Sequence, residues 1–152
     1  MNISLKPYQV KAVDQLVTKA IELLNFDGPG ETIVFQAPTG SGKTIMTAKF
    51  IEGLIKEIPD DDICFVWMSI GKGELHLQSK HSLEKVFNGF PRVTLAEEAF
   101  LGGRDRIVRN EVVVANWEKL RSKDRKSGDW KVLLMKEGEK INFRDVLEKT
   151  KE

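Results

Sequence analysis

Residues 37–44 have the order Ala-Pro-Thr-Gly-Ser-Gly-Lys-Thr, which combines glycines with one ammonium group and hydroxyls. Glycines let a backbone curl so that successive N–H groups point inward at an anion, and the free N-terminal donors of a following helix strengthen the attraction. A lysine at position 43 suits the β- and γ-phosphates, and a Thr44 hydroxyl suits Mg²⁺. The pattern predicts a loop that binds a nucleoside triphosphate, with ATP and Mg²⁺ as the expected cofactors.

The flanking residues favour this interpretation over a glycine-rich turn beneath a helix with an exposed lysine. Residues 32–36, Thr-Ile-Val-Phe-Gln, are β-branched and apolar as in a short buried strand. Apolar residues from Ile45 to Ile55 recur at helical spacing. A strand before the loop and a helix after it are the context that phosphate binding requires. The predicted nucleotide-binding residues are Pro38, Thr39, Gly40, Ser41, Gly42, Lys43 and Thr44, with Lys43 also catalytic and Thr44 the metal ligand.

Strand and helix patterns alternate along the rest of the chain. A helix is predicted from Tyr8 to Phe26, after Pro7, whose missing N–H costs nothing in a first helical turn. Residues 63–69 show no polar alternation, which is typical of a strand buried on both faces. Further strands are predicted at 92–95 and 111–116, and a further helix at 74–87; residues 142–152 form a charged amphipathic stretch. Such alternation predicts an α/β fold: an open parallel sheet with helices on both faces.

Charge balance, cysteine content and the lack of long apolar runs favour an ordinary soluble globular protein. Twenty-four Lys and Arg stand against 23 Asp and Glu, so the net charge of +1 gives no bulk attraction to nucleic acid. The single cysteine, Cys64, lies in an apolar run; we expect a core thiol and a reducing compartment. The chain shows neither a signal peptide nor a run long enough to span a membrane, so we expect a soluble, cytoplasmic protein of one domain.

The loop resembles the first motif of superfamily 2 helicases and translocases, where Ala-x-Thr-Gly-Ser-Gly-Lys-Thr is common. Upstream, Leu-Lys-Pro-Tyr-Gln at residues 5–9 resembles the Arg-Pro-Tyr-Gln element of these proteins, which implies that Gln9 recognises adenine. An amide is well suited to adenine N6 and N7. Residues 112–120, Val-Val-Val-Ala-Asn-Trp-Glu-Lys-Leu, resemble a later motif in the form found in the restriction subunit of type III restriction enzymes and related prokaryotic helicases. The resemblance implies a phosphate-loop NTPase with a RecA-like domain.

Residues 64–69 and 75–79 resemble the second strand of this family and the motif after it, which contacts the backbone of the tracked nucleic-acid strand. The candidate nucleic-acid contacts are Ser69, Gly71, Lys72, Gln78 and Asn116. The resemblance implies an ATP-dependent motor that acts on DNA or RNA. A modification (methyltransferase) subunit is a further candidate partner.

The chain also departs from the family pattern. The family holds Mg²⁺ and orients water with an Asp-Glu pair at the end of a buried strand, commonly Asp-Glu-Ala-His, and no such pair is present. We interpret Glu97 and Glu98 as a solvated helix face. The Ser-Ala-Thr coupling motif and the second motor domain are also missing. We expect an incomplete domain, truncated before the Asp-Glu strand, with an unsatisfied strand edge, weak nucleotide binding and negligible hydrolysis. Its expected parts are a leading helix with the adenine element (1–26), a phosphate-loop core (32–120) and a polar C-terminal segment (121–152).

Two other classes of protein remain open. A phosphate-loop kinase or another NTPase would have an acceptor pocket and no need for Gln9, so it would bind ATP and GTP equally well. A non-catalytic nucleotide-binding interaction module, complete at 152 residues, would have a native reading frame that ends at Glu152.

Overall fold

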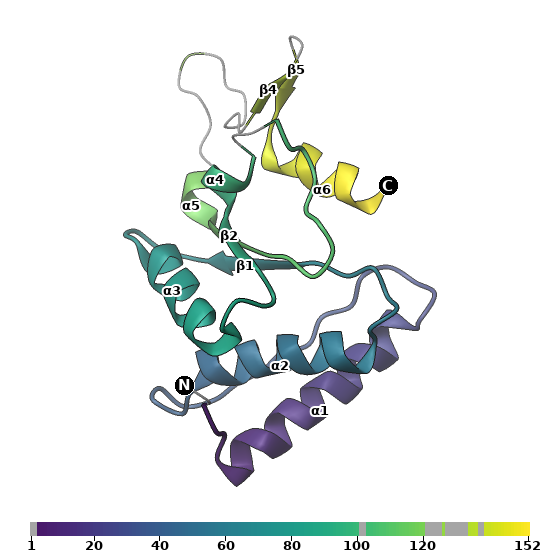
Figure 1. The fold of residues 1–152 in the computed structure, drawn as a ribbon, viewed down its shortest axis with the longest axis vertical. Coiled ribbons are helices and arrows are strands. Elements are labelled where there is room, and N and C mark those ends of the chain that lie inside the picture. The colour runs from purple at the N-terminus through teal and green to yellow at the C-terminus, as the bar shows by residue number, and fades with distance from the viewer. Residues whose placement is uncertain (1–2, 101–102, 121–125, 127–133, 137–138) are drawn as a thin grey trace.

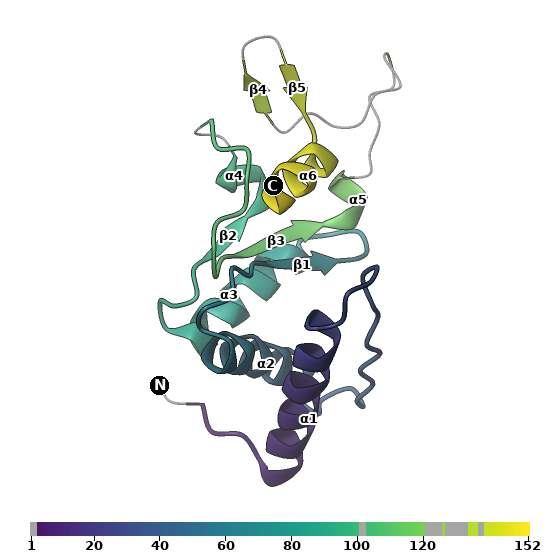
Figure 2. The ribbon, with the colours of Figure 1, turned by 90° about the vertical axis from the view of Figure 1, so that its right-hand side faces the viewer.

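The computed structural model describes residues 3–100, 103–120, 126, 134–136 and 139–152. Its elements are stacked in layers along the long axis of the molecule (Figures 1 and 2). Helix α1 (Pro7–Leu24) lies at one end, against α2 (Lys43–Glu57), and α2 lies with α3 (Leu75–Phe87) beneath a small sheet. Three helices, α4 (Ala96–Ala99), α5 (Trp117–Leu120) and α6 (Phe143–Lys151), lie on the other side of the sheet. The prediction of helices on both faces is confirmed.

The sheet is parallel and has the order β1-β3-β2, with β1 at Phe65–Ser69, β2 at Val93–Leu95 and β3 at Val112–Asn116. Strand β3 is central and all of its residues are buried. Successive side chains of a strand point to opposite faces. Val113 and Ala115 therefore pack in the cluster beneath α4 and α6, while Val112 and Val114 pack in the cluster above α2 and α3. The buried strand predicted at 111–116 is thus confirmed, and it contributes side chains to both cores.

A third, smaller cluster joins the first two helices. Val13 and Val17 of α1 pack against Met46 of α2, and Phe35 and Ala37 lie against the same group. The helix predicted from Tyr8 to Phe26 is confirmed, although it ends at Leu24.

The strand predicted at residues 32–36 is wrong, because the structure has neither helix nor strand there. Val34 is 80% exposed and Ile33 is 38% exposed. A strand requires a hydrogen-bonded neighbour, and β-propensity measures how well side chains fit a pleated, half-buried surface. None of the described strands pairs with this segment, so its β-branched side chains remain in solvent.

The expectation that residues 63–69 are buried on both faces is also wrong. Strand β1 forms, but it is an edge strand of the three-stranded sheet, and Val66 is 39% exposed. An edge strand has unpaired N–H and C=O groups along one side. The expected unsatisfied strand edge is therefore present among the described residues.

The polar segment predicted at 121–152 contains structure that its composition did not indicate. Residues 121–125, 127–133 and 137–138 lie outside the described part. A hairpin of β4 (Leu134–Lys136) and β5 (Glu139–Ile141) leads into α6, the helix formed by the amphipathic stretch. The side chain of Asn142 accepts a hydrogen bond from the Asp145 N–H, and Asp145 in turn accepts one from the Asn142 N–H, so α6 begins with a capping box. Val146 and Phe143 then bury α6 against the sheet.

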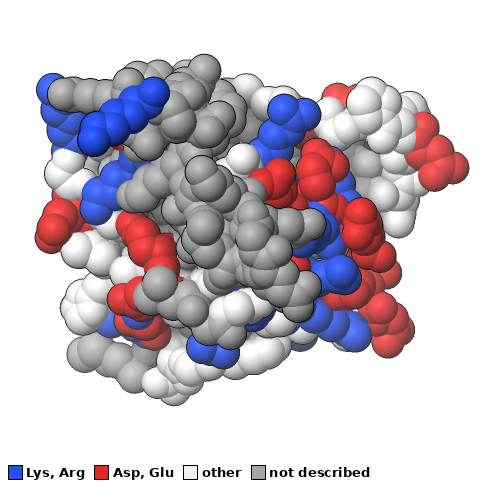
Figure 3. All heavy atoms as spheres, turned by 90° about the horizontal axis from the view of Figure 1, so that it is seen from above, with Lys and Arg blue, Asp and Glu red and all other residues white. Residues whose placement is uncertain are grey.

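No helix among the residues described is both long and apolar enough to cross a membrane. Viewed along the long axis from the β4–β5 end, acidic and basic side chains are intermixed on the described surface (Figure 3). This mixture agrees with the near balance of charges in the sequence.

Candidate nucleotide site

The predicted phosphate loop curls before α2 as its glycines require. Gly40 and Gly42 have φ of 81° and 87°, in the left-handed region that residues with a side chain rarely adopt. Gly42 is the N-cap of α2, so Lys43 and Thr44 occupy its first turn. The first N–H groups of a helix have no partner within the helix and carry its positive dipole end. The loop therefore places these donors where the sequence predicted an anion.

Hydrogen bonds within the loop close it into a tight turn. The Ser41 N–H donates to the Pro38 carbonyl at 3.1 Å, and the Ser41 hydroxyl donates to the same oxygen at 2.6 Å. Thr39 and Gly40 form the exposed tip between them.

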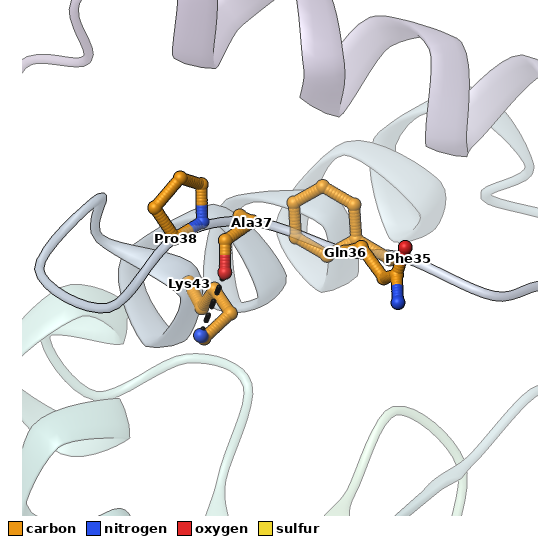
Figure 4. A pocket seen from close by; sticks show the side chains of 5 residues that line it. All are labelled: Phe35, Gln36, Ala37, Pro38 and Lys43. Carbon is orange, nitrogen blue, oxygen red and sulfur yellow. Dashed lines mark hydrogen bonds between the residues drawn. The ribbon is translucent and has the colours of Figure 1, made fainter.

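Lys43 is exposed, and its ammonium group is held close to the loop. The Nζ atom donates to the carbonyl of Ala37 at 2.8 Å (Figure 4). Phe35, Gln36, Ala37, Pro38 and Lys43 line an open hollow of about 420 Å³. A neutral carbonyl is a weaker partner for an ammonium group than a phosphate oxygen, because the phosphate oxygen carries negative charge. The loop, the helix start and this lysine fit a polyphosphate.

The structure brings Gln9 to the phosphate loop, although the two are distant in sequence. Gln9 is buried in the first turn of α1, and its Nε2 donates to the Ser41 carbonyl at 2.8 Å. Its Oε1 accepts from the Lys6 N–H at 2.9 Å, which caps the helix. A Cβ atom at Gly42 would lie 2.6 Å from Gln9 Nε2, so a side chain there would displace the Gln9 amide in addition to straining the backbone at this φ.

Tyr8 is a further member of this site, beyond the residues predicted from the sequence. Its hydroxyl donates to the Ser41 carbonyl at 3.1 Å, so this oxygen accepts bonds from two neighbouring residues of α1. The signal available was its place beside Gln9 in the Leu-Lys-Pro-Tyr-Gln element.

Thr44, the predicted metal ligand, is exposed in the first turn of α2 beside Lys43. A hydroxyl there is close to any phosphate held by the loop, which suits Mg²⁺ bridging protein and phosphate oxygens. Among the described residues, no group of three or more His, Cys, Asp or Glu is placed to hold a metal ion by itself.

The candidate nucleic-acid residues lie around the carboxyl ends of β1 and β3. Asn116, the last residue of β3, donates from Nδ2 to the carbonyls of Gly71 at 3.1 Å and of Gly73 at 3.5 Å. Ser69 ends β1 and lies 3.4 Å from the Ser79 hydroxyl. Lys72 is exposed in the loop that follows β1. Asn116 is buried, so it holds this loop in place rather than presenting its amide to solvent.

Gln78, the fifth candidate, is exposed on α3 of the same region. The interpretation of Glu97 as part of a solvated face is wrong. Glu97 Oε1 lies 3.6 Å from Nε2 of His76, which is 1% exposed, and Glu97 Oε2 is buried without a hydrogen-bond partner. Glu98 is exposed as expected.

Two ionisable groups beside the sheet have shifted pKa values. Burial, with the nearby Asp62 and Glu111 charges, raises the pKa of the Cys64 thiol, as expected for a half-buried core cysteine. Glu111 is 1% exposed; burial alone would raise its pKa. Hydrogen bonds from Arg104, Thr94 and the Val108 N–H outweigh burial and lower the pKa below its ordinary value.

The parallel sheet, its helices on both faces and the curled loop at the start of α2 define an incomplete RecA-like domain of the phosphate-loop NTPase class. The family model for the res subunit of type III restriction enzymes matches residues 2–147. The chain belongs to this family, whose domain is an N-terminal domain of superfamily 2 helicases. The proteins of the family are ATP-binding helicase-type hydrolases that use ATP with Mg²⁺. Searches of curated proteins and of solved structures returned no match to the chain.

Proposed function

We propose that this chain binds ATP at the 37–44 loop as part of an ATP-dependent DNA motor of the type III restriction kind. The observation that carries the proposal is the oriented contact between Gln9 and the loop, 2.8 Å from Nε2 to the Ser41 carbonyl. It connects an adenine-reading side chain to the phosphate-binding backbone.

The orientation of the Gln9 amide supports adenine as the base. An amide nitrogen carries two hydrogens and an amide oxygen has two lone pairs. Ser41 and Lys6 use one of each, so one N–H and one lone pair remain. Adenine offers an acceptor at N7 and a donor at N6, which match this pair. Guanine offers acceptors at both N7 and O6, and O6 would face the Gln9 oxygen.

A binding experiment with two base types and two lysine variants tests the site. Isothermal titration would compare ATP and GTP on the wild type, Lys43→Ala and Lys56→Ala. Lys56 is the matched control, because it lies exposed in the last turn of the same helix. We expect Lys43→Ala to lose ATP binding, Lys56→Ala to retain it and wild type to prefer ATP. Equal affinity for ATP and GTP would favour a kinase or another NTPase, and unchanged binding in Lys43→Ala would refute the site.

We further propose that hydrolysis needs an Asp-Glu pair that these 152 residues do not contain. Bound Mg²⁺ would supply Lewis-acid stabilisation of the phosphates, with the Thr44 hydroxyl as its ligand from this chain. Without carboxylates to hold the ion and orient water, we expect ATP to bind weakly and to persist. Lys43-dependent phosphate release by the purified chain would contradict this.

For nucleic acid, we propose that the loop after β1 contacts phosphates, with Lys72 as its exposed cation and Asn116 as the residue that holds the loop. A phosphate contact strengthens binding about equally at every sequence and contributes about one unit to the salt slope. The Lys72→Ala variant should therefore lower the salt dependence of DNA binding by roughly one unit. Lys85→Ala, at an exposed position near the end of α3, should leave it unchanged. The same titration with RNA in place of DNA would compare the two nucleic acids. Addition of a modification subunit would test whether that subunit binds the chain.

A further inference from the structure

One backbone oxygen in the phosphate loop accepts two side-chain hydrogen bonds from a different element. The Ser41 carbonyl receives Gln9 Nε2 at 2.8 Å and the Tyr8 hydroxyl at 3.1 Å. A carbonyl oxygen has two lone pairs, so both are used. This oxygen is therefore turned toward α1 and held there.

The direction of that carbonyl determines where the next amide points. In a trans peptide the C=O of one residue and the N–H of the following residue point in opposite directions. With the Ser41 carbonyl held toward α1, the Gly42 N–H must point away from α1. Gly42 also caps α2. Its N–H is thus one of the amides that a bound phosphate would meet.

Packing does not account for the position of the Tyr8 hydroxyl. The Tyr8 side chain is 52% exposed, and it is not a member of the α1–α2 cluster of Val13, Val17 and Met46. The described contact of this exposed residue with the phosphate loop is the hydrogen bond from its hydroxyl to the Ser41 carbonyl. Removing only its oxygen therefore leaves the buried contacts of α1 intact.

We propose that Tyr8 is a positioning residue for polyphosphate binding: with Gln9, its hydroxyl fixes the Ser41–Gly42 peptide so that the Gly42 N–H faces the anion. The proposal rests on the nucleotide site proposed above and assigns Tyr8 a role in it that is independent of the base. In this proposal Gln9 binds both the adenine base and the loop, whereas Tyr8 binds the loop alone.

The test compares ATP with inorganic tripolyphosphate, which has no base. A net hydrogen bond corresponds to a change of about two- to tenfold in affinity. We expect Tyr8→Phe to weaken ATP and tripolyphosphate by the same factor in this range and to leave the ATP-to-GTP ratio unchanged. Gln9→Ala should weaken ATP more than tripolyphosphate and should reduce the ratio. Val10→Ala, at an exposed position of the same helix, is the control and should match wild type.

A spectroscopic readout separates positioning from stacking on the base. Tyr8 is the only tyrosine in the chain, so biosynthetic fluorotyrosine gives a single ¹⁹F resonance. We expect tripolyphosphate alone to shift this resonance in the wild-type background and to leave it in place in Lys43→Ala. Equal affinities of wild type and Tyr8→Phe for both ligands would overturn the role of Tyr8, as would a loss confined to ATP. A wild-type protein that binds neither ligand would refute the nucleotide site itself.

Discussion

Gly40 and Gly42 form a matched pair of sites at which substitution by alanine should lower the stability of the fold by different amounts. Both have left-handed φ, 81° and 87°. An alanine in this region costs about 1–2 kcal/mol in backbone strain, whichever position is chosen. A Cβ atom at Gly40 meets nothing within 4 Å, whereas one at Gly42 lies 2.6 Å from Gln9 Nε2.

The difference between the two variants follows from the bonds that Gln9 would lose. To avoid the new methyl group its amide must swing away, which breaks the bonds to the Ser41 carbonyl and the Lys6 N–H. Each bond contributes about 0.5–1.5 kcal/mol net. Gly42→Ala should therefore destabilise the protein by about 1–3 kcal/mol more than Gly40→Ala does.

Urea unfolding measures this difference in unfolding free energy, provided that the denaturant slope (the m value) is the same for the variants. The same comparison in a Gln9→Ala background tests whether the Gln9 amide is its cause. With the amide removed, the excess cost of Gly42→Ala over Gly40→Ala should fall below about 0.5 kcal/mol, the usual limit of additivity. Gly42→Ala should also lose the preference for ATP over GTP, while Gly40→Ala retains it. Two results would refute the close contact between α1 and the loop. One is an equal loss of unfolding free energy for Gly42→Ala and Gly40→Ala in the wild-type background. The other is a larger loss for Gly42→Ala that persists in the Gln9→Ala background.

Three further predictions concern the rest of the domain. The pKa of Glu111 is lowered by its hydrogen bonds, so its ion pair with Arg104 stabilises the fold above the ordinary glutamate pKa of about 4.3 and is lost as pH falls toward the native value. Glu111→Gln should flatten the dependence of unfolding free energy on pH in this acid range, and an unchanged slope would contradict it. Leu83→Ala, at a fully buried position of α3, should cost about 2–5 kcal/mol by urea unfolding. Because burial and nearby carboxylates raise the Cys64 pKa, iodoacetamide at pH 8 should alkylate this thiol much more slowly in the folded than in the unfolded chain, and equal rates would exclude a shielded thiol.

The features predicted correctly from the sequence are those that depend on residues close together in the chain. The apolar residues at 112–115 predicted a buried strand, because burial on both faces leaves no room for polar alternation, and the structure places that strand at the centre of the three-stranded sheet. The glycines of the loop predicted a curled backbone, and Gly40 and Gly42 adopt the left-handed φ that few other residues adopt readily. Gln9 was placed at the site by resemblance to a family element, and the structure brings it within hydrogen-bonding distance of Ser41.

The misses share a physical reason, which is that they depend on contacts between distant segments. Residues 32–36 have the composition of a strand, but a strand forms only where another strand pairs with it. Val66 is exposed because β1 lies at an edge of the three-stranded sheet, and edge and centre cannot be told apart from one apolar run. The contact of Glu97 with His76 joins α4 to the first turn of α3, and no spacing in the sequence indicates it.

The layered packing of α1 has a consequence for motion. This helix rests on α2 through the small cluster of Val13, Val17 and Met46 and lies apart from the sheet (Figure 2). Segments with few buried contacts open at lower free energy than the core of a domain. Amide protons in α1 should therefore exchange with deuterium through a partial opening that leaves β3 protected. Each such event also carries Gln9 away from Ser41, so the empty protein would alternate between a formed and a relaxed loop without unfolding its sheet.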